Sequence, residues 1–153
     1  MTAEPAGEFV GRLDSQDAGE EAVDRAERAE AMYRSLVDSL PGVTYSESLD
    51  HGKTLSVSPQ IEDLLGYTQE EWTGNPRTWT DAVHPDDRER VEASCAEANA
   101  TGEAWRVEYR MITRDGRVVW VRDIATLVRG SKGQALCWQG VCFDITSEKD
   151  GDP

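Results

Sequence analysis

The feature that most constrains this chain is a run of three β-type segments in its C-terminal third. They cover residues 104–113, 117–129 and 134–146, and the turn sequences Asp-Gly and Gly-Ser-Lys-Gly separate them. Such connections between β-rich runs are typical of tight hairpins. The three segments therefore predict an antiparallel meander.

Alternation at period two assigns the faces of these strands, because successive side chains of a strand point to opposite sides. The face of the first segment that we expect to lie in the core carries Trp105, Val107, Tyr109 and Met111. The last segment is apolar on both faces, with Val141 and Phe143 on the outer one. We expect the N-terminal helix or a second subunit to cover that outer face.

The N-terminal part divides into a tail and a helix. Residues 1–17 show no apolar periodicity, and we expect them to be disordered. Over residues 18–40 apolar side chains recur at alternating spacings of four and three, which predicts an amphipathic helix with a heptad seam. The seam consists of Ala22, Ala26, Ala29, Tyr33, Leu36 and Leu40. This helix either lies on its own domain or forms a short coiled coil with a second chain.

The middle of the chain predicts a hairpin followed by helices. Two β-rich runs, 43–49 and 54–58, flank Asp-His-Gly, and short helices with polar caps follow over 58–82. A longer helix begins at His-Pro-Asp-Asp, where proline costs no hydrogen bond and the acids favour the helix dipole. Strands, then helices, then strands indicate an α+β fold with a five-stranded antiparallel sheet and helices over one face.

Four motifs in order resemble the PAS sensor family, in its third fold subgroup and with its trailing PAC motif. They are LLGYTQEEW at 64–72, VHPDDR at 83–88, EYR with DG and WV between 108 and 121, and GV with DIT between 140 and 146. The resemblance covers about residues 30–149. It places a PAS/PAC domain at 41–149, and we expect residues 150–153 to be a disordered tail.

The resemblance implies the PAS fold, in which the sheet cups short helices. It also implies a sensing role, in which binding of a ligand or partner is transmitted through terminal helices to an output domain, such as a histidine kinase or a cyclic-di-nucleotide enzyme. That output domain is either C-terminal or a separate protein. The alternative is a stand-alone interaction or dimerisation domain without a small-molecule ligand.

Strand facing and the resemblance together select the side chains of the cup. The candidates are Tyr45, Leu55, Leu64, Tyr67, Val107, Tyr109, Met111, Val119, Val121, Leu136, Trp138 and Cys142. These side chains either fill a close-packed core or line a cavity for a small, largely apolar ligand.

Cofactors of related domains are not supported by the residues at their usual positions. Haem-binding members present a histidine from the long helix, whereas residues 88–100 contain none. Light-oxygen-voltage members carry a cysteine before that helix, whereas residues 73–79 lack it, and the flavin-facing positions are Val121 and Cys142. We therefore expect neither haem nor photochemical flavin.

No motif indicates catalysis or a metal site. The chain lacks a nucleophile elbow, an HExxH sequence and a phosphate-binding glycine loop, and its three cysteines form no CxxC pair. We expect a non-enzymatic domain without a bound metal.

The end of the domain predicts a signal exit at Asp144, Ile145 and Thr146, because the last strand runs directly into a charged segment. Strand facing makes Arg110 and Arg122 the candidate partners of the Asp144 carboxylate. A homodimer is expected to use the two apolar surfaces, with Tyr33, Leu36, Leu40, Val141 and Phe143 as the contact residues.

Charge limits the partners further. The chain has 16 basic and 30 acidic residues, a net charge of −14. Phosphate groups would be repelled, so we expect neither nucleic-acid binding nor attraction to an anionic membrane. No apolar run is long enough to span a bilayer, and we expect a soluble, cytoplasmic protein.

Overall fold

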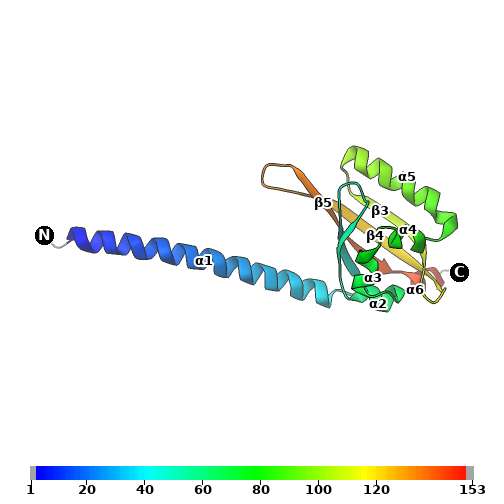
Figure 1. Ribbon diagram of the computed structural model, residues 1–153, viewed down its shortest axis with the longest axis horizontal. Coiled ribbons are helices and arrows are strands. Elements are labelled where there is room, and N and C mark those ends of the chain that lie inside the picture. Colours follow the sequence, from blue (N-terminus) through cyan, green and yellow to red (C-terminus); the bar gives the residue numbers. More distant parts are fainter. Residues whose placement is uncertain (1–2, 151–153) are drawn as a thin grey trace. The chain divides into compact units, whose positions relative to one another are not determined.

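Two units make up the protein, the helix α1 (Ala3–Ser39) and the residues from Leu40 onward. The computed structural model describes residues 3–150 and the side chains of 18–149 (Figure 1). Within α1, Asp24 pairs with Arg28 and Glu30 with Arg34, each one helical turn apart. Tyr33 and Leu36 of the heptad seam are exposed on this helix.

The limits of the terminal segments differ from the prediction. Because α1 begins at Ala3, the disorder expected for residues 3–17 is wrong. Pro5 lies in the first turn, where a missing N–H costs no intrahelical hydrogen bond. Asp150 ends a helix, whereas the tails predicted at 1–2 and 151–153 lie outside the described residues.

The second unit is built on one antiparallel sheet in the order β2-β1-β5-β4-β3. Its strands are β1 (Val43–Glu47), β2 (Thr54–Val57), β3 (Trp105–Ile112), β4 (Val118–Arg129) and β5 (Ala135–Asp144). Pairing of β1 with β5 joins the first hairpin to the C-terminal meander. The predicted five-stranded antiparallel sheet is thereby confirmed.

Four helices connect the two parts of the sheet and lie over one of its faces (Figure 1). They are α2 (Gln60–Leu65), α3 (Gln69–Gly74), α4 (Thr78–Ala82) and α5 (Pro85–Thr101). Local sequence explains their limits. Thr68 and Glu71 form a capping box at the start of α3, and Gly102 adopts the left-handed conformation that ends α5. A last helix, α6 (Thr146–Asp150), follows β5.

The core lies between the helices and the inner face of the sheet. Alternation predicts this face correctly, since Trp105, Tyr109 and Met111 of β3 are buried while Arg106 between them is exposed. On the opposite face of β5, Val141 and Phe143 are half-buried. That face of β5 is therefore less covered than the core side.

Candidate functional site

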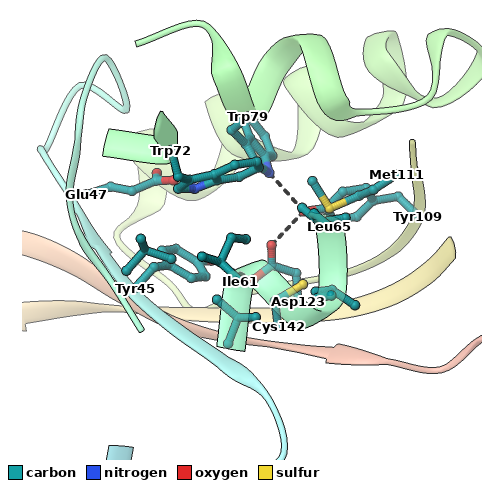
Figure 2. Close-up of a pocket in the computed structure, with 13 residues that line it drawn as sticks. Tyr45, Glu47, Ile61, Leu65, Trp72, Trp79, Tyr109, Met111, Asp123 and Cys142 are labelled. Atoms are coloured by element: carbon teal, nitrogen blue, oxygen red, sulfur yellow. Dashed lines mark hydrogen bonds between the residues drawn. The ribbon is translucent and has the colours of Figure 1, made fainter. Parts of the chain in front are cut away.

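A cavity of about 20 Å³ lies between the sheet and the short helices (Figure 2). Strands β1 to β5 all contribute to its walls, together with α2, α3 and α4. Its lining consists of Val43, Tyr45, Glu47, Val57, Ile61, Leu64, Leu65, Trp72, Trp79, Tyr109, Met111, Asp123 and Cys142.

The lining can be compared with the side chains predicted for the cup. Five of them border the cavity: Tyr45, Leu64, Tyr109, Met111 and Cys142. The others that remain in or against the core without bordering the cavity are Tyr67, Val107, Val119, Val121 and Trp138.

Two predicted cup residues are wrong. Leu55 is 50% exposed and Leu136 is 53% exposed. Leu55 lies on β2, at the edge of the sheet, and Leu136 lies beside the β4–β5 turn, which projects beyond α2 to α5 in Figure 1. Alternation predicts the face of a side chain, but it does not show how far the covering layer extends.

Asp123 is the polar centre of the cavity. It lies on β4, only 3% of its surface is exposed, and each of its carboxylate oxygens accepts one hydroxyl group. Tyr45 donates to Oδ1 at 2.5 Å and Tyr109 donates to Oδ2 at 2.7 Å. Trp79 in turn donates from Nε1 to the Tyr109 oxygen at 3.0 Å, as the dashed lines of Figure 2 show in part.

Burial controls the charge of this carboxyl group. Loss of solvation raises the pKa of Asp123 to about 7, although the two tyrosine hydroxyls act in the opposite direction. Burial also raises the pKa values of Tyr45 and Tyr109 well above their ordinary range, so both remain hydrogen-bond donors. No cationic side chain contributes to the pKa of Asp123 among the described residues.

A second carboxylate, that of Glu47, lines the cavity from β1 and pairs with a histidine. Its Oε2 lies 2.8 Å from Nδ1 of His51, whose Nε2 lies 2.9 Å from Oδ1 of Asn99. That Asn99 oxygen also accepts the Trp138 indole N–H. The hydrogen bond to Glu47 raises the pKa of His51 and so favours the charged form of its ring.

A different aspartate, Asp87, fastens α5 to β3. Its carboxylate accepts two hydrogen bonds from the Arg110 guanidinium, at 3.0 and 2.8 Å, and one from the Arg110 backbone N–H at 2.9 Å. These bonds lower the pKa of Asp87 to about 2. Asp87 therefore does more than favour the helix dipole, the role predicted from the sequence.

The residues predicted as a signal exit, Asp144 to Thr146, are bonded mainly to β4. Ile145 is buried and donates its N–H to the Trp120 carbonyl at 2.9 Å, while the Trp120 N–H donates to the Thr146 hydroxyl at 3.0 Å. Asp144 Oδ1 accepts the Thr146 N–H at 2.9 Å. This local turn fixes the first residue of α6.

The predicted pairing of Asp144 with Arg110 or Arg122 is wrong. Arg110 is occupied by Asp87, whereas Arg122 pairs with Glu108 and with Glu148 of α6. Asp144 is the last residue of β5, and its carboxylate instead accepts the Thr146 backbone N–H. The charged link between the sheet and α6 therefore runs from Arg122 of β4 to Glu148 of α6.

Sequence reasoning missed several residues of the cavity, above all Asp123. It has the same alternation parity as Val119 and Val121, so the pattern that placed those valines inside could have placed it there too. Glu47 shares the parity of Tyr45 in the same way. Trp72 and Trp79 come from short helices, for which the sequence gives no comparable periodicity.

A cupped antiparallel sheet, a cavity on its inner face and an exit helix after its last strand define a sensory domain of the PAS class. The comparisons with known proteins agree with this assignment. The family model described as PAS fold matches residues 54–142, and the chain belongs to this family.

Similar proteins are sensors with much longer chains. A methyl sulfide methyltransferase-associated sensor of Methanosarcina acetivorans is 35% identical over 97 residues, which cover 63% of this chain and 10% of that protein. The two-component sensor PprA of Pseudomonas aeruginosa is 30% identical over 135 residues, covering 85% of this chain and 14% of that one. This chain therefore spans only a small part of either relative.

A solved structure shows the same architecture. The N-terminal domain of a diguanylate cyclase with PAS/PAC sensor from Marinobacter aquaeolei is 31% identical and superimposes with a TM-score of 0.64. The match covers 71% of this chain and 98% of that domain. The chain is thus a signal-sensing PAS module.

Within residues 3–150, no helix is long and apolar enough to cross a membrane. The side chains placed in the structure contain no group of three or more His, Cys, Asp or Glu residues that could hold a metal ion.

Proposed function

We propose that this module couples the state of its core cavity to the exit helix α6, and through α6 to an output domain in a longer protein or a separate one. The observation that supports this most is the double role of β4. Its Asp123 side chain lines the cavity. Three residues earlier, the Trp120 backbone carbonyl accepts the Ile145 N–H and the Trp120 N–H donates to the Thr146 hydroxyl. A shift of β4 caused by binding would therefore reach the exit directly.

The ion pairs of the outer face extend this link. Glu108 of β3 contacts both Arg122 and Lys149, and Arg122 also contacts Glu148. The Lys149 ammonium lies 4.9 Å from the centre of the Trp120 ring. These pairs are partly exposed and contribute little stability, so their role is to orient α6.

Under this proposal the domain does not catalyse a reaction, and it takes neither haem nor a photochemical flavin. The small cavity and the residues Val121 and Cys142 at the flavin-facing positions support this view. The largely apolar ligand predicted from the sequence needs revision, because Glu47 and Asp123 both border the cavity. The cytoplasmic location predicted from the sequence stays a prediction.

The experiment is amide hydrogen exchange of the purified chain, wild type against Asp123→Asn. We expect exchange at the Ile145 amide to change at least threefold in the variant, because its acceptor lies on the same strand. The Asp86→Asn variant, altered at an exposed side chain on α5, is the matched control. Exchange at Ile145 that is the same in all three proteins would contradict the proposed coupling.

A second role, as a homodimer, is favoured by the exposed apolar side chains of α1, among them Val23, Met32 and Leu36. We propose that Tyr33, Leu36 and Leu40 form the seam, with Val141 and Phe143 of the outer sheet face as a further contact. Leu36→Glu should then convert the dimer to a monomer in light scattering at micromolar concentration. A wild-type chain that scatters only as a monomer would contradict this.

A further inference from the structure

We infer that the core cavity binds ammonium or a short primary alkylammonium ion, with the Asp123 carboxylate as its counter-ion. This deepens the proposed function, because it names the ligand class of the same cavity. Charge is the first argument. Two carboxylates line the cavity, and His51 pairs with one of them, Glu47, whereas Asp123 receives only hydroxyl donors.

Aromatic walls are the second argument. The faces of aromatic rings attract cations, and most strongly where water is excluded. Two tyrosines of the sheet and two tryptophans of the short helices border this cavity: Tyr45, Trp72, Trp79 and Tyr109. Figure 2 shows the tryptophans on the helix side of the cavity and Asp123 on the sheet side, so an ion in the cavity would lie between aromatic rings and a carboxylate.

Hydrogen-bonding capacity favours an N–H donor over a metal ion. A carboxylate offers about four acceptor positions, and the two tyrosine hydroxyls fill one on each oxygen of Asp123. The remaining positions suit the N–H groups of an ammonium ion. A hard metal ion needs about six oxygen ligands, more than this mixed aromatic and apolar lining supplies.

Size limits the ligand. The cavity of about 20 Å³ is small and has room only for a small ion or molecule. Ammonium is about as large as water, and a methyl or ethyl group on it would contact Ile61 or Leu65, which also border the cavity. Tetramethylammonium is too large unless the core rearranges.

Protons compete with such an ion for Asp123. The titratable groups that interact with this carboxyl are Glu47 and Tyr45 on β1, Tyr109 on β3, Cys142 on β5 and Cys95 on α5. Helices α2 to α4 contribute only apolar and tryptophan side chains to the cavity. With a pKa of about 7, the ionised form of Asp123 is roughly tenfold more populated at pH 8 than at pH 6. Apparent affinity should rise by about the same factor.

The test is titration of the purified full chain with methylammonium chloride, followed by tryptophan fluorescence and by NMR amide shifts at constant ionic strength. We expect a saturable response for the wild type and for the control Asp144→Asn. For Asp123→Asn we expect at least tenfold weaker binding. Tetramethylammonium and potassium chloride should produce no saturable response, and wild-type affinity should be about tenfold higher at pH 8 than at pH 6.

Three results would overturn the inference: no saturation in the wild type, equal binding by Asp123→Asn, or affinity that does not change between pH 6 and pH 8. The pH comparison uses only the wild type, so it decides the matter even if Asp123→Asn fails to fold. Native mass spectrometry separates this inference from the proposed function. A different molecule retained in the purified chain would refute the ammonium ligand, but it would not contradict the proposal that the cavity senses a ligand.

Discussion

Asp87 and Asp123 are both buried, with 5% and 3% of their surfaces exposed, yet their surroundings have opposite effects on their charge. Asp87 faces the Arg110 guanidinium, and its pKa falls to about 2. Among the side chains that the structure describes, Asp123 faces two tyrosine hydroxyls and no cation, and burial raises its pKa to about 7. Burial alone therefore does not decide whether a carboxyl group is charged.

The difference separates a structural aspartate from one that is poised to respond. Asp87 carries its counter-ion within the fold and joins the start of α5 to β3. Asp123 lies in the cavity and gains either a proton or a cationic ligand near neutral pH. Ligand and proton would thus act on the same carboxyl group, that of Asp123. It lies three residues after Trp120, the residue of β4 that bonds to Ile145 and Thr146.

Removing the structural aspartate should cause the largest loss of stability. Asp87→Ala leaves the Arg110 guanidinium and its backbone N–H without their acceptor, and we expect a loss of about 3 kcal/mol in the free energy of unfolding. Denaturant unfolding at pH 7 measures it. The neighbouring control Asp86→Ala, at an exposed side chain, should cost well under 1 kcal/mol, and similar losses in both variants would contradict the distinction.

Neutralising Asp123 should change the free energy of unfolding in the opposite direction. The folded state holds the Asp123 proton between pH 4 and 7 while the unfolded chain has released it, so wild-type stability falls as pH rises through this window. A shift of about three pKa units corresponds to at most ~4 kcal/mol. Asp123→Asn does not titrate.

The Asp123→Asn variant should therefore match the wild type at low pH and exceed it in stability at pH 8. Unfolding of both proteins from pH 4 to pH 8 measures the difference, and subtracting the two curves removes the contributions of all other groups. A variant that is less stable than the wild type at pH 8 would mean that Asp123 is as structural as Asp87.

Much of this fold follows from the sequence, and the reasons differ by element. Period-two alternation places Tyr109 and Met111 inside, and the turn residues of the meander fix its antiparallel pairing. The same alternation also places Asp123 inside, because it follows Val121 by two residues and therefore lies on the same face of β4. A buried carboxylate is rare without a partner, so alternation alone predicts the apolar members of this face and not Asp123.

Other features depend on long-range geometry that alternation does not contain. Arg110 selects Asp87, 23 residues away, over the predicted Asp144 because α5 packs against β3. Leu55 and Leu136 have a suitable parity but lie where the helical layer gives them little cover. Which residues form an ion pair, and which side chains the helices cover, depends on how helices and strands pack together and not on the local sequence.

A smaller effect is expected from Gly140→Ala on β5. A Cβ atom there would lie 2.4 Å from the Tyr45 hydroxyl oxygen and 2.8 Å from the Ile124 carbonyl oxygen. We expect a loss of about 2 kcal/mol in unfolding experiments and a further rise in the pKa of Asp123, because Tyr45 must move away. The pKa of Asp87 should not change.

Gly19→Ala is the control for that substitution, since nothing lies within 4 Å of the new methyl group on α1. It should leave stability equal or slightly higher, as alanine favours a helix. A Gly140→Ala chain that is as stable as this control would show that the Tyr45 contact with Asp123 is easily rearranged.

The smallest effect on stability is expected at the exit. Asp144→Ala removes the acceptor of the Thr146 N–H from an exposed side chain, and we expect a loss of at most about 1 kcal/mol in thermal unfolding. In a longer receptor that contains this domain, the same change should weaken signalling. A loss of stability as large as that of Asp87→Ala would show that Asp144 is structural.

The most direct test of the contrast between the two buried aspartates is a titration of their side-chain carboxyl carbons by NMR in one sample of the full chain. We predict that Asp123 titrates near pH 7 and that Asp87 stays ionised down to about pH 2. Saturating methylammonium should lower the midpoint of Asp123 and leave Asp87 unchanged. Two aspartates that titrate together in the ordinary range near pH 4 would contradict the account.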